Sequence, residues 1–338
     1  MMKSVLNKIV LSLLILSIAA VTAQADESRM QQTNAIHELI SGWNTSEARL
    51  RLDLLLAAEP QDPAIRFTEG RLLFFEGEYG LAAEKLELLA RDLGPEPPAP
   101  VTDMLEQASK THEVLKKFSE KRSENGRFLV RYTGRDEILV DAVIDVLRRA
   151  DESLSEDFAF KPEGTVVVEI YPSIRFLSAV TSLTEADIET SGTIALCKYN
   201  RLMVTSPRAL VRGYQWRDTL SHEFVHYYLT KMSGNVVPIW LHEGVAKFQE
   251  SRWNQAPAQP LAPPKEDLLA RSIKSNQLIT FDQMHPSMAK LPSQEAAGLA
   301  FAQVHTVIGF LHELKGYVGI RGLVNALVKR KCIPTTGN

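Results

Sequence analysis

The chain has 338 residues, of which 45% are hydrophobic, 23% charged and 7% aromatic, a composition typical of a folded protein. This composition excludes collagen-like, low-complexity and disulfide-scaffold proteins, and the length indicates about two domains, each able to bury a core. With 38 Lys and Arg against 41 Asp and Glu, the formal net charge is −3. Because no excess of positive charge is available to attract a polyanion, we expect no nucleic-acid partner.

The first 25 residues have the pattern of a secretory signal peptide. Lys3 and Lys8 precede the apolar run 9–21, and Ala23-Gln24-Ala25 supplies the small residues of a cleavage site after Ala25. An uncleaved membrane anchor is the alternative, but the run is shorter than the roughly 18–20 apolar residues that span a bilayer. We therefore expect a periplasmic or secreted protein with no stable membrane span after signal cleavage.

Two proline-rich stretches divide the rest of the chain. Residues 94–100 and 255–264 can neither propagate a helix nor pair in a central strand. We expect the following division: a signal peptide over 1–25, a helical module over 26–124, a second domain over 125–254, and a proline-rich linker with a C-terminal helical subdomain over 255–338.

The helical module contains an internal repeat. The residues that recur after 34 positions are Ala48, Leu52, Leu55 and Pro60, which return as Ala82, Leu86, Leu89 and Pro95, the last offset by one. This period resembles the tetratricopeptide repeat, in which small residues let neighbouring helices approach closely and leucines fill the seam. The amphipathic stretch 101–121 would cap the short array. Two roles stay open for the module: a groove for a protein partner, or a helical shoulder for the next domain.

A region of mixed α and β character begins at residue 127. Segments 128–132, 165–171 and 201–205 are rich in β-branched or aromatic residues and are bounded by turn formers, whereas 137–154 has a helical period. The short, glycine-led segment 191–196 is typical of an edge strand. The sequence therefore predicts an α+β domain here.

The motif His-Glu-x-x-His follows this region. Residues 218–229 have a helical pattern, and His222 and His226 stand four apart, so both imidazoles can reach one metal ion. Glu223 would then lie beside the metal, close enough to take a proton from bound water. The alternative is a pair of ordinary core or surface histidines, since a five-residue motif also occurs by chance.

A third ligand candidate, Glu243, comes after an intervening stretch of sixteen residues. It belongs to a second helical segment that begins at Pro238, and a turn through Gly234 and Asn235 would bring this helix back against the first. Two histidines and one glutamate, with a fourth position left for water, form the catalytic rather than the structural type of zinc site.

The motifs His-Glu-x-x-His and Trp-Leu-x-Glu-Gly-x-Ala together resemble the gluzincin metallopeptidases, the clan of thermolysin and aminopeptidase N, and in particular bacterial envelope peptidase-like proteins with a tetratricopeptide N-terminus. The resemblance covers roughly residues 127–322. It implies one Zn²⁺ ion per chain on His222, His226 and Glu243, with Glu223 as general base and proton shuttle. It also implies that segment 192–196 pairs with the backbone of a peptide or protein substrate.

The fold that the resemblance implies is α+β. It consists of an all-α, tetratricopeptide-like N-terminal module, a thermolysin-like zincin domain with a mixed sheet and active-site helices, and a C-terminal helical subdomain. In that subdomain, residues 297–315 and 318–330 form two helices that close the cleft from the other side.

The sequence departs from the clan in the residues expected to contact substrate. The Gly-x-Met-Glu-Asn segment that captures a free amine in the aminopeptidase branch is missing, which argues against an aminopeptidase. Phe301 stands where relatives often carry the tyrosine that steadies the oxyanion. His305, one turn on, is the substitute that we predict as a second catalytic residue, and Tyr317 and Tyr214 are weaker candidates.

Three other residues compete for roles at the metal. His242 and Glu250 are rival ligands, and Asp218, one turn before His222, either orients an imidazole or is an exposed acid at a helix start. The two cysteines, Cys197 and Cys332, can form a disulfide or remain thiols, and two free thiols are the favoured alternative.

The sequence therefore indicates a periplasmic or secreted zinc metallopeptidase, and an endopeptidase rather than an aminopeptidase. One alternative is an envelope interaction protein whose repeat module binds a protein partner while the zinc domain is catalytically idle. The intact Glu223 argues against it, and the missing oxyanion donor argues for it. The other alternative is a metallohydrolase that uses the same three ligands on an ester or amide.

Overall fold

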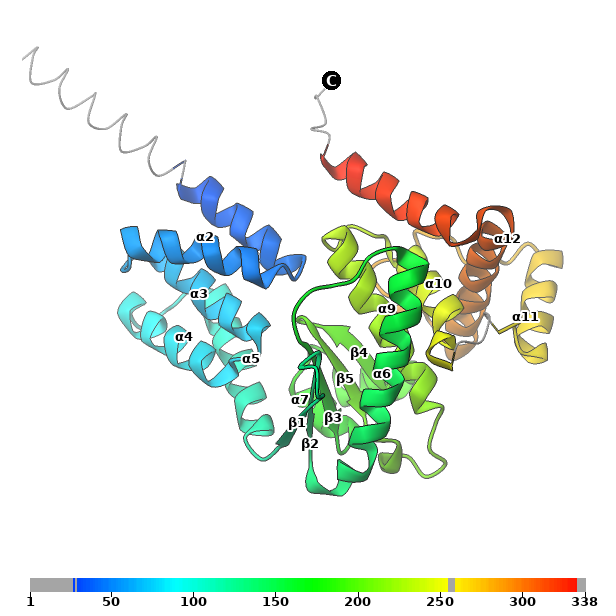
Figure 1. The fold of residues 1–338 in the computed structure, drawn as a ribbon, viewed down its shortest axis with the longest axis horizontal. Helices are drawn as coiled ribbons and strands as arrows, with labels where there is room; N and C mark the ends of the chain where they lie inside the picture. Colours follow the sequence, from blue (N-terminus) through cyan, green and yellow to red (C-terminus); the bar gives the residue numbers. More distant parts are fainter. Residues whose placement is uncertain (1–26, 28, 255–258, 333–338) are drawn as a thin grey trace, which may run out of the picture.

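A computed structural model describes residue 27, residues 29–254 and residues 259–332 (Figure 1). The predicted signal peptide, 1–25, lies outside the described residues. A helical module lies on one side of a small sheet, and the C-terminal helices lie on the other. The fold is thus α+β and mostly helical, as predicted. No helix in the described part of the chain is both long and apolar enough to cross a membrane.

The N-terminal module is all-α. Its elements are a helical segment over 29–41, then α2 (Thr45–Ala58), α3 (Pro63–Glu76), α4 (Tyr79–Leu93) and α5 (Ala99–Leu115). From α2 to α5, each helix packs against the next. The repeat positions lie in these seams: Ala48, Leu52, Ala82 and Leu86 are fully buried. Leu86 packs on Gly70, where a Cβ would meet its side chain at 2.6 Å. The repeat thus predicts the packing, while membership of the tetratricopeptide family stays a prediction.

The predicted boundary after residue 124 lies too late. Helix α5 ends at Leu115 rather than continuing to residue 121, and β1 (Ser119–Arg122) already belongs to the sheet, paired antiparallel with β2 (Phe128–Tyr132). All four residues of β1 are exposed. Such a strand carries no apolar alternation in its sequence, since its contacts are the backbone pairing with β2 and the ion pairs of Glu120 with Arg131 and of Lys121 with Asp141.

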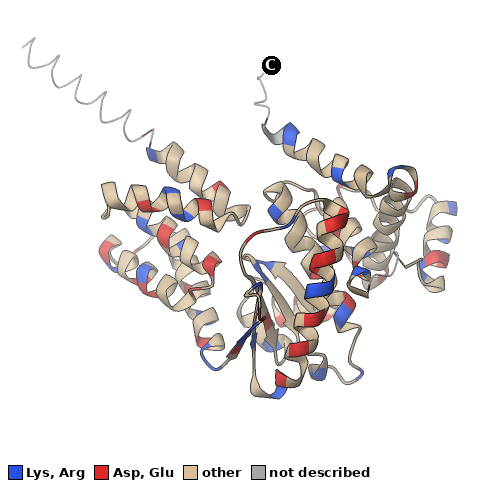
Figure 2. Ribbon diagram, in the orientation of Figure 1, with Lys and Arg blue, Asp and Glu red and all other residues tan. Residues whose placement is uncertain are grey.

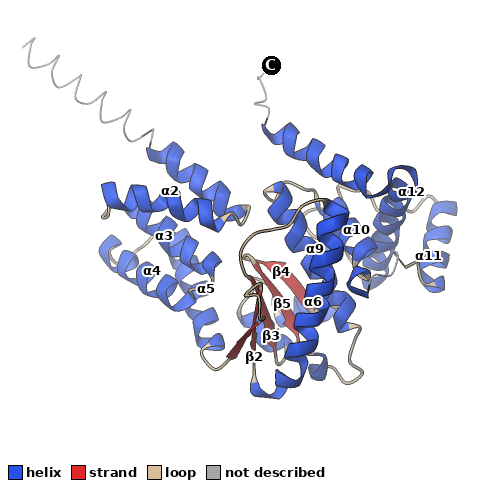
Figure 3. Ribbon diagram, viewed as in Figure 1, coloured by secondary structure: helices blue, strands red, loops and turns tan. Residues whose placement is uncertain are grey.

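The sheet has the order β1-β2-β3-β5-β4 (Figure 3). Strands β3 (Val166–Tyr171) and β5 (Arg201–Thr205) pair in parallel in the centre, and β4 (Ala195–Lys198) pairs antiparallel with β5 at the edge. The predicted strands are therefore confirmed. The edge strand begins later than predicted, because residues up to Ser191 form α8 (Glu185–Ser191), which Gly192 ends in a left-handed conformation at φ 71°.

Alternate residues of the central strands face two different cores. Val168 and Leu202 pack under α6 (Glu137–Phe158) and α9 (Trp216–Ser233). Tyr171 and Met203 face the opposite side, where they pack against residues of α3, α4, α5 and α7 (Ile174–Ala179). The helical module thus covers one face of the sheet, which is the shoulder role left open by the sequence.

A fully buried carboxylate links the module to the sheet. Glu169 of β3 accepts hydrogen bonds from the hydroxyls of Tyr79 in α4, at 2.8 Å, and Tyr171, at 2.6 Å. It also pairs with Arg201 Nε at 3.0 Å and with Arg131 at 3.4 Å. The Arg201 guanidinium lies over the Tyr79 ring, 4.6 Å from its centroid. Such a charge tolerates burial because opposite charges and hydrogen bonds surround it.

The C-terminal part packs against α6 and α9. Its elements are α10 (Ile239–Gln249), α11 (Pro263–Lys274) and α12 (Gln294–Cys332). Gly316 interrupts α12 with φ 58° and ψ −162°, so two helices meet between the predicted segments 297–315 and 318–330. The sequence missed α11, because the proline pair that indicated a linker occupies its first turn, where a missing N–H costs nothing. The described chain also contains short 3₁₀ turns at Gly134–Asp136, Pro207–Ala209, Arg252–Asn254 and Met288–Lys290.

Both signs of charge are interspersed over the surface (Figure 2). On α6, for example, Arg148 pairs with Asp145 at 2.9 Å and with Glu152 at 2.7 Å. This mixture agrees with the balanced composition from which we expect no nucleic-acid partner.

The packing of α12 on α10 depends on Gly244, and this can be tested. A Cβ at Gly244 would meet Ile308 at 2.9 Å and Val304 at 3.1 Å. We therefore expect Gly244→Ala to lower the free energy of unfolding of the metal-free protein by about 1–3 kcal/mol. Gly322→Ala is the matched control, because that glycine is also helical and nothing lies within 4 Å of its Cβ position. Urea unfolding followed by circular dichroism measures both, and equal effects would contradict the packing argument.

Candidate metal centre

Two consecutive helices carry the predicted metal ligands. His222 and His226 lie one turn apart on α9, with ring centroids 4.8 Å apart. Gly234 and Asn235, with φ of 62° and 64°, end this helix and turn the chain. Pro238 then precedes α10, which brings Glu243 back against α9.

The separations of the ligand atoms fit a zinc ion. Glu243 Oε2 lies 3.3 Å from His222 Nε2 and 3.4 Å from His226 Nε2. Ligands at about 2.0–2.1 Å from a tetrahedral zinc are about 3.4 Å apart. The three atoms all lie within 4.8 Å of one another, and no other such group of His, Cys, Asp or Glu is found among the described residues. These three residues can therefore hold one metal ion.

The electrostatics of the site favour a positive charge. Burial acts to lower the pKa of His222, but the hydrogen bonds that it donates to the carboxylates of Glu243 and Glu250 raise this pKa to about 10. Burial acts to raise the pKa of Glu243, but the two imidazoles hold it well below its usual range. The carboxylates are therefore ionised, and the site would stabilise a cation.

The two rival ligands instead contact the far nitrogens of the imidazoles. Glu250 Oε2 lies 3.4 Å from His222 Nδ1, and its other oxygen accepts from Lys247 at 2.5 Å. His242 Nδ1 lies 2.6 Å from His226 Nδ1. Both residues can thus orient a ligand and leave its Nε2 for the metal.

The hydrogen bond between His226 and His242 joins two ring nitrogens, one of which donates while the other accepts. Burial, reinforced by the charge of His226, lowers the pKa of His242 to about 3. A neutral imidazole that accepts at Nδ1 carries its proton on Nε2, which lies 3.4 Å from Thr230 Oγ1. In the arrangement in which His226 donates from Nδ1 to His242, His226 Nε2 is left for a metal ion.

Asp218 does not orient an imidazole. Its carboxylate accepts a hydrogen bond from Trp253 Nε1 at 2.6 Å, and so holds the 3₁₀ turn Arg252–Asn254 against α9. The sequence could not indicate this, because Trp253 follows 35 residues later and carries no motif.

Glu223 lies on α9, the helix of the two histidines, and its side chain faces the edge strand β4. Its side chain is buried, and it accepts a hydrogen bond from the backbone N–H of Cys197 in β4. Burial raises its pKa, an effect that the two imidazoles oppose. Cys197 itself is a free thiol, with a pKa that burial raises well above its usual value. The side chain of Cys332, its predicted alternative partner, lies outside the described residues.

A cavity of about 900 Å³ opens at the metal site. Residues 192–199, which include β4, form one wall, and α9, α10 and α12 form the others. The helical module also contributes to the lining, through Ser41, Trp43, Arg71 and Phe75. The free edge of β4 therefore borders the same space as the three ligands and Glu223.

None of the three predicted oxyanion donors lines this cavity among the described residues. His305 packs against Phe248, with ring centroids 5.8 Å apart, and burial lowers its pKa. The Tyr214 hydroxyl donates to the Thr205 carbonyl, and Tyr317 packs on His312 at 4.5 Å. The prediction of His305 as a catalytic residue is thus without support from its position, because it lies on a part of α12 that faces α10 rather than the cavity.

Two cationic residues that line the cavity, Lys265 and Arg71, escaped the sequence analysis. Phe301 lines the cavity with its ring 6.5 Å from that of His222, and Lys265 Nζ lies against Gly298, one turn before Phe301. Arg71 lines the cavity from α3. No sequence signal marks either cation, because Lys265 looks like an ordinary surface residue of α11 and Arg71 like one of a repeat helix.

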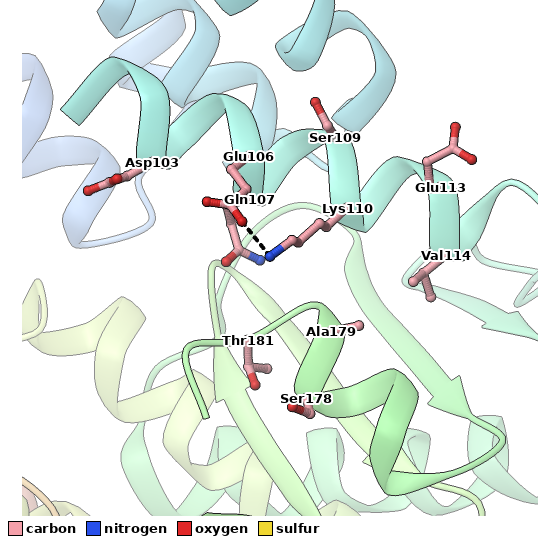
Figure 4. Close-up of a pocket in the computed structure, with 10 residues that line it drawn as sticks. All are labelled: Asp103, Glu106, Gln107, Ser109, Lys110, Glu113, Val114, Ser178, Ala179 and Thr181. Atoms are coloured by element: carbon pink, nitrogen blue, oxygen red, sulfur yellow. Dashed lines mark ion pairs between the residues drawn. The ribbon is translucent and has the colours of Figure 1, made fainter. Parts of the chain in front are cut away.

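A second cavity, of about 760 Å³, lies between α5 and α7 (Figure 4). Glu106 and Lys110 form an ion pair of 2.5 Å at its rim, and Gln107 donates to the Val180 carbonyl at 2.6 Å. Its described lining includes no histidine or cysteine. Its described lining therefore offers no second group of metal ligands like the one beside β4.

Comparison with known proteins finds only distant similarity, to solved structures. No protein-family model matches the sequence, and no curated protein matches it. Among solved structures, yeast LTA4 hydrolase in complex with bestatin is similar, with a TM-score of 0.39 and 15% sequence identity. The match covers 63% of this chain and 33% of that one. So weak a likeness carries nothing over to the metal site of this chain, which rests on its own geometry.

The first test of the site is its metal content. We expect purified protein incubated with zinc to retain about one ion per chain after desalting. We expect His226→Ala to retain almost none, because two ligands hold zinc far less tightly than three. His305→Ala is the matched control and should retain the metal. Mass spectrometric metal analysis measures this, with circular dichroism to verify folding, and a folded wild type without zinc would contradict the site.

The second test concerns the orienting residue Glu250. Replacing it by Gln removes the charge that faces His222 Nδ1, and we expect zinc affinity to fall about 10–100-fold. Glu189→Gln, an exposed change on α8, should leave the affinity unchanged. Competition with a fluorescent zinc chelator measures both. Unchanged affinity in Glu250→Gln would show that this contact does not support the ligand.

Proposed function

We propose that the protein is a zinc-dependent peptidase of the gluzincin type. The observation that carries this proposal is the convergence, in one cavity, of three residues with the spacing of zinc ligands, a buried carboxylate beside them and the free edge of β4. Zinc bound there would supply a Lewis acid that polarises the substrate carbonyl and acidifies a water molecule.

The residues of the chain would divide the reaction among them. A substrate backbone would add to β4 as a further strand, which holds the scissile bond beside Glu223. Glu223 would take the proton of the attacking water and deliver it to the leaving amine. Its raised pKa suits a group that both accepts and donates protons. The Phe301 ring has no hydrogen-bond donor for the oxyanion. A cation of the cavity lining, such as Lys265, would therefore have to stabilise it.

The lining of the cavity favours an endopeptidase over an aminopeptidase. Its described acidic residues are Glu223, Glu243 and Glu250. Each already has a role: Glu243 and Glu250 contact the imidazoles, and Glu223 is the base. No further described carboxylate is left in the lining to bind the free amine of a substrate. Capture of that amine is what an aminopeptidase requires.

We also propose that the enzyme acts outside the cytoplasm, in the periplasm or after secretion. The support is the sequence of residues 1–25, with its two lysines, apolar run and small residues. A protein partner on the outer surface of the helical module stays a prediction, which rests on the repeat alone.

The decisive experiment compares zinc-loaded wild type with Glu223→Gln on a library of quenched fluorescent peptides. We expect the variant to keep its zinc and to lose at least about 100-fold in kcat/KM, because the base and proton donor is removed. Glu189→Gln is the matched surface control. A wild type that binds zinc and cleaves neither peptides nor esters would indicate a catalytically idle domain, and one that cleaves only esters would indicate a different hydrolase.

The same library tests the type of peptidase. We expect peptides acetylated at the N-terminus to be cleaved as fast as those with a free amine, since no described carboxylate remains to recognise that amine. Mass spectrometry of the products locates the cleaved bond. Activity confined to the first residue of peptides with a free amine would instead indicate an aminopeptidase.

A further inference from the structure

We propose that Arg71 forms an anion-binding subsite at the end of the cleft nearest the helical module, and that it takes a carboxylate of the peptide substrate. The carboxylate belongs to a residue about two positions from the scissile bond. The inference deepens the proposed peptidase function and rests on it for the identity of the ligand.

The charge of Arg71 is unusual because no described carboxylate pairs with it. Most of the other half-buried or buried arginines do have such a partner, for example Arg49 with Glu76, Arg127 with Asp151, Arg131 and Arg201 with Glu169, and Arg252 with Asp157. Arg321, which is also half-buried, donates to the backbone carbonyls of Glu156 and Asp157 instead and does not line the cleft. Arg71 is half-buried, yet no described acidic oxygen lies within 4.0 Å of it. A buried or half-buried cation of this kind gains stability from an anion that enters from outside.

Neutral groups hold the Arg71 guanidinium in position. One terminal nitrogen lies 2.7 Å from His37 Nδ1, and the other donates to Ser41 Oγ at 2.9 Å. The guanidinium also lies over the Phe75 ring, 5.5 Å from its centroid. Burial, with the charge of Arg71 added, lowers the pKa of His37 to about 4, so His37 is an uncharged acceptor at neutral pH. The guanidinium of Arg71 is thus held in one orientation, while no anion neutralises its charge.

Arg71 lies where the cleft continues past the metal. It lines both the cavity of the metal site and a neighbouring cavity of about 450 Å³, and Tyr199 is shared by the two in the same way. Asp103 lines the neighbouring cavity but not that of the metal site, and it forms no ion pair with Arg71. A cation and an aromatic ring therefore stand where the two cavities adjoin.

The β4–β5 hairpin fixes Arg71 relative to the metal site. Tyr199, at the tip of the hairpin, packs edge-on against Phe75, with ring centroids 5.8 Å apart, and Asn200 donates to the Phe75 carbonyl at 3.2 Å. Arg71 is one turn before Phe75 on α3 and so shares its face. The hairpin thus anchors the face that carries Arg71 at one end of β4.

The spacing along β4 defines which substrate residue meets Arg71. The Cys197 N–H contacts Glu223, and Tyr199 follows two residues later. Strand β4 ends at Lys198, and Tyr199 is the first residue of the turn that follows, with φ 56°, so its ring lies at the end of the strand. A peptide paired with β4 would therefore bring the residue about two positions from its scissile bond to Tyr199 and Arg71.

The remaining charges of the cleft agree with an anionic substrate. Lys198 and Lys265 also line the cavity, and neither forms an ion pair with a described carboxylate. The acidic lining residues are engaged at the metal site. The ligand chemistry that fits Arg71 is a planar carboxylate, which a guanidinium binds in a bidentate manner. An acidic side chain and the terminal carboxylate of a short peptide both present this group.

The test uses zinc-loaded full-length protein and peptides identified from the library above. Each cleaved peptide is made with Asp or Asn two positions from the scissile bond, on either side, and with a free or amidated C-terminus. We expect wild type to prefer the carboxylate form at one position by about 10–100-fold in kcat/KM, the range of a charge-assisted hydrogen bond. A preference for Asp over Asn identifies a side chain, and a preference for the free over the amidated end identifies the terminus.

We expect Arg71→Gln to remove this preference, because the variant has lost the charge that binds the carboxylate. Its activity toward the carboxylate form should fall at least tenfold more than its activity toward the amide. Arg71→Lys should retain part of it, since the charge remains while the fork is lost. Arg66→Gln is the matched control on the same helix, because that arginine pairs with Asp92 and does not line the cleft. Equal losses toward both forms in Arg71→Gln, or no preference in wild type, would overturn the subsite.

A binding measurement separates this inference from the peptidase proposal. Fluorescence anisotropy with labelled Asp and Asn peptides requires no turnover. Binding that favours Asp and depends on Arg71, without cleavage, would support the subsite and contradict the peptidase. Cleavage that is indifferent to Asp, Asn and Arg71 would support the peptidase and overturn the subsite.

Discussion

The Glu169 carboxylate is fully buried, and the relative position of the helical module and the sheet depends on it. Two tyrosine hydroxyls and two arginines converge on this single charge from α4, β2, β3 and β5. Removing one member of such a network leaves an uncompensated buried charge, which typically costs about 3–5 kcal/mol. Because Arg71 and Phe75 reach the cleft from the module, the wall of the cleft is held in place by a charge on the far face of the sheet.

The metal centre depends on a second level of contacts that no motif describes. Each histidine has one nitrogen directed to Glu243 and the other to a partner on α10, either Glu250 or His242. All three of these residues lie on or just after one helix, so the position of α10 determines the geometry of the whole site. Gly244 permits α12 to press against that helix. Packing and chemistry are therefore coupled through a residue that has no side chain.

The parts that the sequence predicts well are those in which local pattern and final structure agree. The runs 128–132 and 201–205 become strands with those same bounds, and the two-part zinc motif places its ligands on adjacent helices. Prediction fails where backbone pairing or distant contacts decide. The exposed strand β1 has no apolar alternation, Asp218 finds its partner in Trp253, and His305 is turned toward α10. Hydrophobic periodicity predicts which face of a helix is buried, but it does not predict which element packs against that face.

The lining of the cleft is drawn from separate stretches of the chain, the first at Ser41 and the last at Phe301. Synthesis proceeds from the N-terminus, and the parts of the cleft are consequently made in a fixed order: first the wall that carries Arg71, then the edge strand, then the ligand helices and last the face of α12. A chain that has not yet reached Phe301 lacks one side of the cleft, even when all three ligands have been made. Completion of the binding site is thus one of the last events in the assembly of the molecule.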